Sequence, residues 1–492
     1  MKPKETINLY RVISLLVIAL VTFGVMGGLG AKSHLYPDEW LSMFFLTLIF
    51  LLVCMFELEY ERKQKGISAN TQTTFIRLSV TYTVSGGLIY AISYLPEFYR
   101  PVMIPVILLT AVSNSMVAVS FGLFFDLVLA LTVGGSFYAL AAYMMLTMLA
   151  AVLAQALKEN SIAYINYDGV TPNPTTTAVN EAAAIAKDFG AKAVIAIGGG
   201  SPTDAGKSVA ILLKYTDKNA NDIYEFKFTP TEAAPIVAIN LTHGTGTETN
   251  RFAVVTIPEK DYKPAIAYDC IYPTYAIDDP ALMTKLSPKQ TRYVSIDAVN
   301  HVVEAATSTV TSPYAITLAR EVITLVAKYL PKAIENPEDL EARYFLAYAA
   351  MMGGVCFDNG LLHYTHALEH PLSAVKHELS HGLGLAMLLP AVVKNIFTAK
   401  AETLKYILEP IAGCINTAEE ASSGVYEWLK SVGVPSKLKD EGFTEGEIPN
   451  LVNLAFTTPS LDGLLAIAPT KATKETVEER FEEFAKKYRE EL

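Results

Sequence analysis

The chain has 492 residues, enough for roughly two to four domains, and 51% of them are apolar. Its mean hydropathy of +0.30 is high for a purely soluble protein. The formal charge of −11 and the pI near 5.4 provide no basic surface to neutralise nucleic-acid phosphates, and they argue against nucleic-acid binding. The four cysteines are scattered without a Cys-x-x-Cys pair, so the sequence indicates neither a disulfide framework nor a thiolate zinc site.

The apolar excess lies almost entirely in residues 1–157, which we expect to form an all-α transmembrane bundle of about six spans. Each apolar stretch approaches the ~20 residues that a bilayer span requires. Hydrophobic segments recur after the first, which excludes a single cleaved signal peptide. The stretches are Val12–Gly30, Trp40–Cys54, Phe75–Leu95 and a longer run from Val102 to Leu157 that holds one charged residue.

Basic residues set the expected orientation of this segment. Lys2, Lys4 and Arg11 precede the first span, and a second basic group that includes Arg62 follows the second span. An even number of spans then leaves both chain ends in the cytoplasm. We therefore predict a multi-pass membrane protein that contacts the lipid bilayer through residues 1–157 and carries residues 158–492 in the cytoplasm.

The sequence changes character at Lys158. Alternating strand and helix patterns predict an α/β domain with a Rossmann-like parallel sheet over residues 158–279. Helical patterns then predict an all-α domain over residues 280–492, ending in an amphipathic helix. The expected elements are strands at Ile162–Tyr167, Ala193–Ile197 and Pro235–Asn240, and helices at Thr177–Phe189 and Lys474–Glu490.

A glycine-rich turn follows the second of these strands. The sequence Gly198-Gly-Gly-Ser-Pro-Thr-Asp204 leads into a helix-like run, an arrangement that lets backbone N–H groups and a helix N-terminus approach a pyrophosphate. The nearby Gly206-Lys207-Ser208 imitates a nucleoside-triphosphate-binding loop. That pattern requires glycine at position 201, where Ser201 stands, so we reject an NTPase.

Six of the eight histidines lie between His301 and His381. Asp297 and His301 are four residues apart, as are His366 and His370, and on a helix this spacing places both side chains on one face. Three imidazoles and one carboxylate converging on a point would suit a divalent transition metal such as iron or zinc. We expect the helical domain to hold such a site.

Two other functions compete with a metal-dependent enzyme of this kind. His377-Glu378-Leu-Ser-His381 matches the zincin motif, in which two histidines bind zinc and the glutamate acts as a base, so a membrane zinc metalloprotease is one alternative. That function leaves Asp297 and His366 without a role. The other alternative is a membrane protein with a catalytically inert cytoplasmic appendage.

Six motifs together resemble the iron-dependent (group III) alcohol dehydrogenases, over about residues 158–492. They occur in the order and approximate spacing of that family, and the ordered combination is specific where no single motif would be. The motifs are Tyr167-Asp-Gly-Val-Thr-Pro-Asn-Pro174, Ile197-Gly-Gly-Gly-Ser-Pro-Thr-Asp204, Gly244-Thr-Gly-Thr-Glu248, Ala276-Ile-Asp-Asp-Pro280, Asp297–His301 and His366–Gly382.

The resemblance implies reversible oxidation of a primary alcohol to an aldehyde by hydride transfer to NAD or NADP, with Fe(II), or zinc in some relatives, as the metal. It is compatible with a homo-oligomer. It assigns the metal to Asp297, His301, His366 and His381, and proton relay to His370. It assigns the dinucleotide to Asn173, Pro174, Gly198, Gly199, Gly200, Ser201, Asp204, Thr242, Thr245 and Lys263.

Two departures from the family pattern bear on the cofactor. His243 stands where many relatives carry a small residue, so local cofactor contacts are expected to differ. The family's opening strand and helix are missing, and residues 1–157 look like a segment fused in their place. A truncated parallel sheet exposes apolar faces and removes one wall of the adenosine site, so we expect weakened nicotinamide binding. The acidic residue that distinguishes NAD from NADP would lie in the missing part.

Overall fold

The computed structural model describes residues 16–17, 19–25, 148–149 and 152–478. The chain separates into two units, Met1–Gly169 and Val170–Leu492. In the first unit, the described residues up to 159 are helical. Apart from these short stretches, the predicted transmembrane spans lie outside the described residues.

The α/β part of the second unit is built on a three-stranded parallel sheet in the order β1-β2-β5. Helix α8 covers one face, where Gly206 packs directly against Ala196 of β1. Helix α7 begins with a Thr175 cap that accepts a hydrogen bond from the Ala178 N–H, and it ends at the left-handed Gly190. These elements are α7 (Thr176–Phe189), β1 (Val194–Gly198), α8 (Gly200–Leu212), α9 (Ala220–Tyr224), β2 (Ile236–Asn240) and β5 (Tyr275–Asp278).

The predicted parallel sheet and its first helix are confirmed, with bounds that differ by one residue at each end at most. The predicted strand at Ile162–Tyr167 is wrong, because residues 162–170 form no strand. Ile162 and Ile165 have strand propensity, yet each is about half exposed. A strand exists only where a neighbouring strand pairs with its backbone, and propensity alone does not supply that neighbour.

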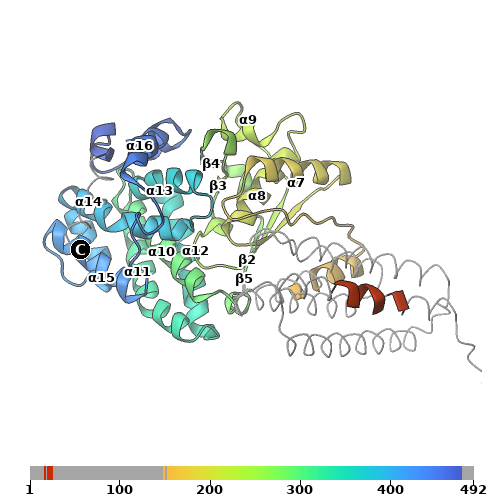
Figure 1. Cartoon of the computed structure of the whole chain (residues 1–492), viewed down its shortest axis with the longest axis horizontal. Coiled ribbons are helices and arrows are strands. Elements are labelled where there is room, and N and C mark those ends of the chain that lie inside the picture. The colour runs from red at the N-terminus through yellow and green to blue at the C-terminus, as the bar shows by residue number, and fades with distance from the viewer. Residues whose placement is uncertain (1–15, 18, 26–147, 150–151, 479–492) are drawn as a thin grey trace, which may run out of the picture. The chain divides into compact units, whose positions relative to one another are not determined.

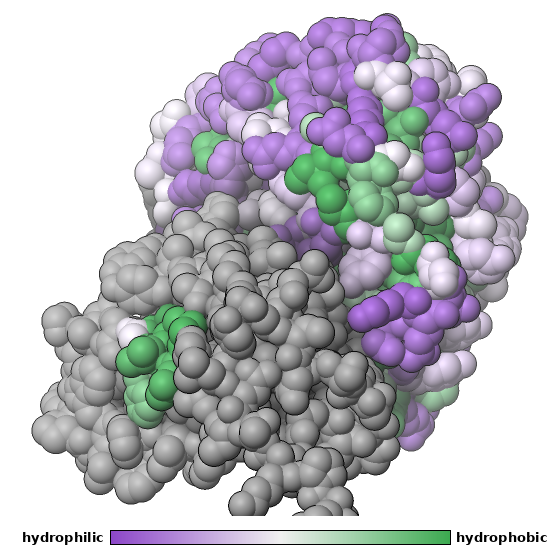
Figure 2. All heavy atoms as spheres, turned by 90° about the vertical axis from the view of Figure 1, so that its right-hand side faces the viewer, coloured by the Kyte–Doolittle hydropathy of each residue, from purple (hydrophilic) through white to green (hydrophobic). Residues whose placement is uncertain are grey.

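The face of the sheet opposite α8 carries a row of apolar side chains. Ile195, Val237 and Tyr275 are partners in register across the three strands and so point to the same side. Ile195 is 38% exposed, Tyr275 68% and Ile277 45%. Figure 2 shows apolar areas interrupting the hydrophilic surface of the described part of the chain.

A two-stranded antiparallel ribbon, β3 (Phe252–Val254) and β4 (Ala265–Ala267), joins the sheet to the helical part. Its buried Ala253 and Ile266 belong to the same apolar core as Val209 and Ile211 of α8. This ribbon and the loop before it carry several of the side chains that face the candidate site.

The helical part confirms the predicted all-α character after Pro280. Helix α10 lies at its centre and packs against α11, α12 and α14 (Figure 1). It begins at a Ser287 cap with Pro288 in the first helical position, and nearly all of its residues from Val294 onward are buried. The helices are α10 (Pro288–Thr307), α11 (Pro313–Glu335), α12 (Leu340–Gly360), α13 (Tyr364–Val375), α14 (His381–Ala412), α15 (Ala418–Ser431), α16 (Ile448–Thr457) and α17 (Leu461–Ala466).

The predicted C-terminal helix starts at Lys474 and continues at least to residue 478, the last described residue. Among the described residues, α14 is the one helix long and apolar enough to cross a bilayer, and 72% of its apolar window is buried within the protein. Helices α12 and α13 would pass the same test as a pair, but they meet at a bend of 110°. Burial of this kind is typical of core helices.

Lys207 is committed to the fold rather than to a phosphate. Its fully buried ammonium donates hydrogen bonds to the main-chain oxygens of Thr247 (2.7 Å), Asn250 (2.9 Å) and Phe252 (2.7 Å). These bonds tie α8 to the segment that leads into β3. The rejection of an NTPase from the sequence is consistent with this placement.

Lys207→Met keeps the apolar stem and removes the ammonium, so it leaves three buried carbonyl oxygens without their donor. We expect the free energy of unfolding to fall by at least about 3 kcal/mol. Urea unfolding followed by circular dichroism measures the change. The exposed Lys214→Met is the control and should stay within about 0.5 kcal/mol of the wild type. Equal midpoints for both variants would contradict the assigned role.

Candidate functional site

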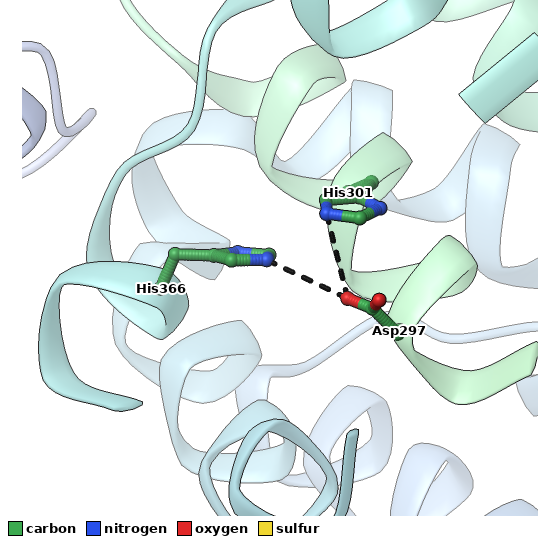
Figure 3. A group of neighbouring side chains, drawn as sticks. All are labelled: Asp297, His301 and His366. Carbon is green, nitrogen blue, oxygen red and sulfur yellow. Dashed lines mark ion pairs between the residues drawn. The ribbon is translucent and has the colours of Figure 1, made fainter. Parts of the chain in front are cut away.

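Three helices bring the predicted metal ligands together at the centre of the helical part. Asp297 and His301 lie one turn apart on α10, as the sequence spacing predicted. His366 comes from the first turn of α13, and His381 is the first residue of α14. Figure 3 shows the imidazoles of His301 and His366 facing the Asp297 carboxylate from two sides.

Asp297 Oδ1 is the point on which these side chains converge. It lies 3.4 Å from His301 Nε2, 3.7 Å from His366 Nε2 and 3.8 Å from His381 Nε2. These distances are too long for hydrogen bonds, and within the described part of the chain Asp297 Oδ1 and His366 Nε2 are buried without a hydrogen-bond partner. Ligands about 2.1 Å from one ion lie roughly 3 to 3.6 Å apart, a range that holds the distance to His301 and falls just short of the other two. Asp297, His301 and His366 form one group of possible metal ligands, whereas His381 falls in a neighbouring group with Glu369 and His370.

Access to this group is uneven. Asp297, His301 and His366 are almost fully buried, whereas the His381 side chain is 26% exposed. His301 is held by stacking between Phe357 (ring centroids 4.6 Å apart) and His366 (4.8 Å). A small molecule would therefore reach the group from the His381 side.

Two buried glutamates contact the far sides of two imidazoles. Glu304 accepts a hydrogen bond from His366 Nδ1, and Glu369 accepts one from His381 Nδ1. Glu304 is fully buried behind His366 rather than on a helix surface. Sequence reasoning missed Glu369. Its signal was a carboxylate between the two histidines of His366-Ala-Leu-Glu-His370, in an otherwise apolar part of the sequence.

Burial and charge act against each other in this group. Burial opposes ionisation of Asp297 and Glu304, but the neighbouring imidazoles, His301 for Asp297 and His366 for Glu304, hold the pKa of each at about 2. Burial also opposes protonation of His366, yet Glu304 and Asp297 raise its pKa to about 9. Burial lowers the pKa of His301 to about 4. A metal that binds here must displace the proton of His366.

A second cluster links the metal group to the α/β part through Lys263. Its ammonium donates to Asn173 Oδ1 (2.9 Å) and Ser373 Oγ (2.7 Å) and lies 3.6 Å from Glu369. Its main-chain oxygen accepts a hydrogen bond from His370 Nδ1 (2.8 Å). Because Nδ1 is the donor, the other ring nitrogen of His370 carries a lone pair. Burial and the Lys263 charge lower the pKa of this imidazole well below its usual range.

The Asn173 side chain is fully occupied by protein partners. Its Nδ2 donates to the main-chain oxygens of His377 (2.9 Å) and Leu379 (3.4 Å), and its Oδ1 accepts from Lys263. The adjacent Pro174 is buried, and its carbonyl oxygen accepts from Thr256 N (2.7 Å). Asn173 and Lys263, both predicted to face the cofactor, therefore also fasten the loop before α14 to the α/β part.

The glycine-rich turn lies between β1 and α8, at the carboxyl end of the strand. Gly198 has a φ of +143°, which favours glycine, and α8 starts at Gly200. A Cβ on Gly199 would come within 2.8 Å of Thr242, and one on Gly200 within 2.6 Å of Thr245. The structure thus brings Gly199 and Gly200 of the turn against the two threonines predicted to bind the cofactor with it, and Ser201 follows them in the first turn of α8.

Asp204, in the first turns of α8, holds the neighbouring segment in place. It accepts hydrogen bonds from Thr247 Oγ1 (2.7 Å) and Val254 N (2.9 Å). Both partners belong to the protein, so Asp204 supports the glycine-rich turn by holding the neighbouring segment 247–254 against α8.

His243 lies in the loop after β2 and is buried. Its Nδ1 lies 3.1 Å from Ser295 Oγ and its Nε2 2.9 Å from Arg343 Nη1. Burial first and then the Arg343 charge lower the pKa of His243 to about 3. A neutral imidazole in this position joins the loop after β2 to α10 and α12.

Glu248 is a buried acid in the loop after β2. Within the described part of the chain its two carboxyl oxygens have no hydrogen-bond partner. Burial first, and then the nearby Asp278 carboxylate, raise its pKa to about 8. The acid is therefore mostly neutral in the folded protein at pH 7.

The zincin motif is not formed. Helix α13 ends at Val375, and α14 begins at His381, so His377 and Glu378 lie in the connecting loop and are exposed. The motif requires both histidines on one helix face, which a helix break inside the motif prevents.

A single histidine in an apolar helical run is usually a satisfied core residue, so the sequence favours that role for both His363 and His377. The prediction is wrong for His377, which is exposed. It is confirmed for His363, which is buried and bonded to Thr307 (2.9 Å).

Two protein-family models match this chain. "Iron-containing alcohol dehydrogenase" matches residues 139–280, and "Fe-containing alcohol dehydrogenase family, C-terminal" matches residues 291–484. The first match begins within the predicted membrane segment, 19 residues before Lys158.

Curated relatives and solved structures give the same likeness. The long-chain primary alcohol dehydrogenase AdhA of Thermoanaerobacter ethanolicus is 59% identical over 336 residues, 68% of this chain and 84% of the relative. The NADPH-dependent butanol dehydrogenase of Clostridium saccharobutylicum is 34% identical, over 66% of this chain and 85% of the relative. The crystal structure of the NADH-dependent butanol dehydrogenase A of Thermotoga maritima is 28% identical, with a TM-score of 0.63 over 71% of this chain and 89% of that one.

Asp297→Asn keeps the shape of the side chain but removes the charge on which three imidazoles converge. We expect at least about tenfold weaker binding of a divalent metal, because a neutral amide is a poorer ligand and does not balance the cation. Metal per chain after dialysis against a range of free metal concentrations measures the loss. Asp188→Asn, the same change on an exposed residue of α7, should bind as the wild type does. Equal metal content in both variants would refute a ligand role for Asp297.

The raised pKa of Glu248 predicts a pH dependence of stability. Between about pH 4.5 and 8 the folded chain holds a proton on this acid that the unfolded chain releases, so its contribution to stability falls as the pH rises. Glu248→Gln is fixed in the neutral form. From pH 5 to 8 the variant should therefore become progressively more stable than the wild type, by at most about 1.4 kcal/mol for each step of one in pH.

Urea unfolding at intervals of one in pH measures this difference. The matched control is Glu338→Gln, which changes a glutamate whose side chain is 69% exposed, and its curve should run parallel to the wild type. Parallel curves for Glu248→Gln as well would show that Glu248 is ionised in the folded protein.

Proposed function

Because this chain belongs to the iron-containing alcohol dehydrogenase family and is an NAD(P)-dependent alcohol dehydrogenase, we propose that it interconverts primary alcohols and aldehydes by hydride transfer. The observation that carries the site assignment is the convergence of three imidazole nitrogens on Asp297 Oδ1. The relative that is 59% identical is named for long-chain primary alcohols, and we extend that preference to this chain.

We propose that Asp297, His301, His366 and His381 hold the metal, with Fe(II) as the resident ion and zinc as the alternative. Bound there, the ion would supply Lewis acidity that lowers the pKa of the substrate hydroxyl. The partly exposed His381 marks the side from which the alcohol enters.

His370 is the proposed proton acceptor. Its Nδ1 is occupied by the Lys263 carbonyl oxygen, so its free nitrogen is the one able to take a proton. Burial lowers the pKa of His370 and so keeps its imidazole neutral, with the lone pair that a proton acceptor needs. Its position on α13, one turn after His366, sets it beside the ligands: the ring centroids of the two histidines are 6.2 Å apart.

We propose that the cofactor pyrophosphate lies at the N-terminus of α8, against Gly198, Gly199, Gly200 and Ser201. Main-chain N–H groups at a helix start favour an anion, and glycines let it approach closely. Thr242 and Thr245 pack on this turn and complete its edge. Asn173 and Lys263 would contribute chiefly by fixing the wall between cofactor and metal, since their polar atoms already bond to each other.

Cofactor affinity is proposed to be lower than in relatives that have the opening strand and helix. The described sheet has three strands, and its face opposite α8 exposes Tyr275 and Ile277. An open face loses the rigidity that covering helices give a parallel sheet. The proposal predicts a raised KM for the nicotinamide cofactor more than a lowered kcat.

The purified full chain, loaded with Fe(II), is assayed for NADH and NADPH oxidation with aldehydes of increasing length. We expect metal-dependent turnover that improves with chain length, and His370→Gln should lower kcat by about 100-fold or more. Asp188→Asn serves as the matched surface control. An Fe(II)-loaded chain with no turnover on any aldehyde would favour the inert appendage, and peptide cleavage lost in Glu378→Gln would favour the protease.

We also propose that residues 1–157 anchor the enzyme in a membrane as a multi-pass segment, with residues 158–492 in the cytoplasm. The support is the recurrence of apolar stretches of span length and the basic residues that flank them. After cell fractionation, the chain should stay with membranes through alkaline carbonate washing and leave them in detergent. Release by carbonate alone would overturn an integral anchor.

A further inference from the structure

We infer that Glu304 and Glu369 are positioning residues, which hold the imidazoles of His366 and His381 in the tautomer and orientation that metal binding requires. This inference rests on the proposed metal site. Neither glutamate needs to touch the ion, the alcohol or the cofactor.

Glu304 serves two sets of donors at once. One carboxyl oxygen, Oε1, accepts from the main-chain N–H groups of His363 (3.1 Å) and Thr365 (2.6 Å) at the start of α13. The other, Oε2, accepts from His366 Nδ1. A fully buried carboxylate thus fixes the first turn of α13 and, within that turn, the ring of the ligand.

Glu369 works from the opposite side. It lies on α13 and is fully buried, and its Oε2 accepts from His381 Nδ1 while the Lys263 ammonium lies 3.6 Å away. Gly384 makes room for it, because a Cβ at that position would lie 2.7 Å from Glu369 Cγ. Glycine in the first turn of α14 therefore has a packing cause connected with the site.

The consequence for the imidazoles follows from hydrogen-bond chemistry. A carboxylate can only accept, so each Nδ1 carries a proton, and Nε2 is the nitrogen left to present a lone pair to a metal once any proton on it has been displaced. Those two Nε2 atoms are the ones that lie 3.7 and 3.8 Å from Asp297 Oδ1. A carboxylate behind an imidazole also raises its strength as a ligand.

Glutamine substitutions separate the hydrogen-bonding role of each carboxylate from the role of its charge, because an amide has one acceptor oxygen and no charge. In Glu304→Gln the amide must turn its NH2 group either toward the N–H groups of α13 or toward His366 Nδ1, so one set of bonds is lost. In Glu369→Gln the oxygen can stay on His381, because within the described part of the chain Glu369 Oε1 has no hydrogen-bond partner and can be replaced by NH2. The second variant loses charge but keeps geometry.

The test measures Co(II) affinity and the visible absorption of the Co(II) form on the metal-free full chain, with a competing chelator. We expect Glu304→Gln to bind roughly 10- to 100-fold more weakly with an altered spectrum, and Glu369→Gln about tenfold more weakly with the spectrum retained. Glu248→Gln is the matched control, a buried glutamate outside the metal group, and should bind within about twofold of the wild type.

A purely structural role would lower the unfolding midpoint of the metal-free chain and leave Co(II) affinity and spectrum unchanged, which would overturn the inference. If Glu304→Gln fails to fold, Glu369→Gln decides, since Glu369 caps no helix. If both fail to fold, the structural role is favoured and the inference is lost. Because the readout is metal binding, these outcomes stand apart from any failure of the dehydrogenase assay.

Discussion

Three buried carboxylates in one cluster constrain how the helices of the second unit can pack. Asp297, Glu304 and Glu369 are almost fully buried within one side-chain cluster, and Lys263 is the buried ammonium beside them. Once the proton of His366 has been displaced, three carboxylates and one ammonium leave two uncompensated negative charges, which would cost several kcal/mol each in such a place. A divalent cation removes that cost, so the arrangement of α10, α13 and α14 is most stable when the ion is present. Metal binding at this group would therefore be coupled to folding of the helical part.

The elements that carry the ligands could be predicted because their signals are local. The four-residue spacings at Asp297 and His366 require helices if both side chains are to face one way, and both lie on helices. The strands β1 and β2 were predictable for the same reason. By contrast, Ile162–Tyr167 has the composition of a strand but no partner strand. The zincin match that begins at His377 requires a continuous helix there, whereas α13 has already ended at Val375.

What the sequence could not supply is long-range pairing between polar groups. Glu304 and His366 are 62 residues apart, and Lys263 and Ser373 are 110 apart, so no window of the sequence contains both partners. Glu369 and Lys263 come close to each other only when α13 packs against the loop between β3 and β4. The resemblance placed Lys263 at the cofactor, whereas its observed hydrogen bonds are to Asn173, Ser373 and His370.

Lys263 contacts both the α/β part and the helical part, and so helps to fix the position of one relative to the other. Its side chain bonds to Asn173 of the α/β part and Ser373 of α13, and its main chain orients His370. Hydride transfer requires cofactor and alcohol to be held within a few tenths of an ångström of the reactive separation, and a misplacement of about 1 Å can cost 100-fold in rate. A buried ammonium shared by both parts resists such displacement, because moving either part breaks charge-assisted hydrogen bonds. The contacts of Lys263 lie on the helical side of the α/β part, so they do not depend on the exposed sheet face opposite α8.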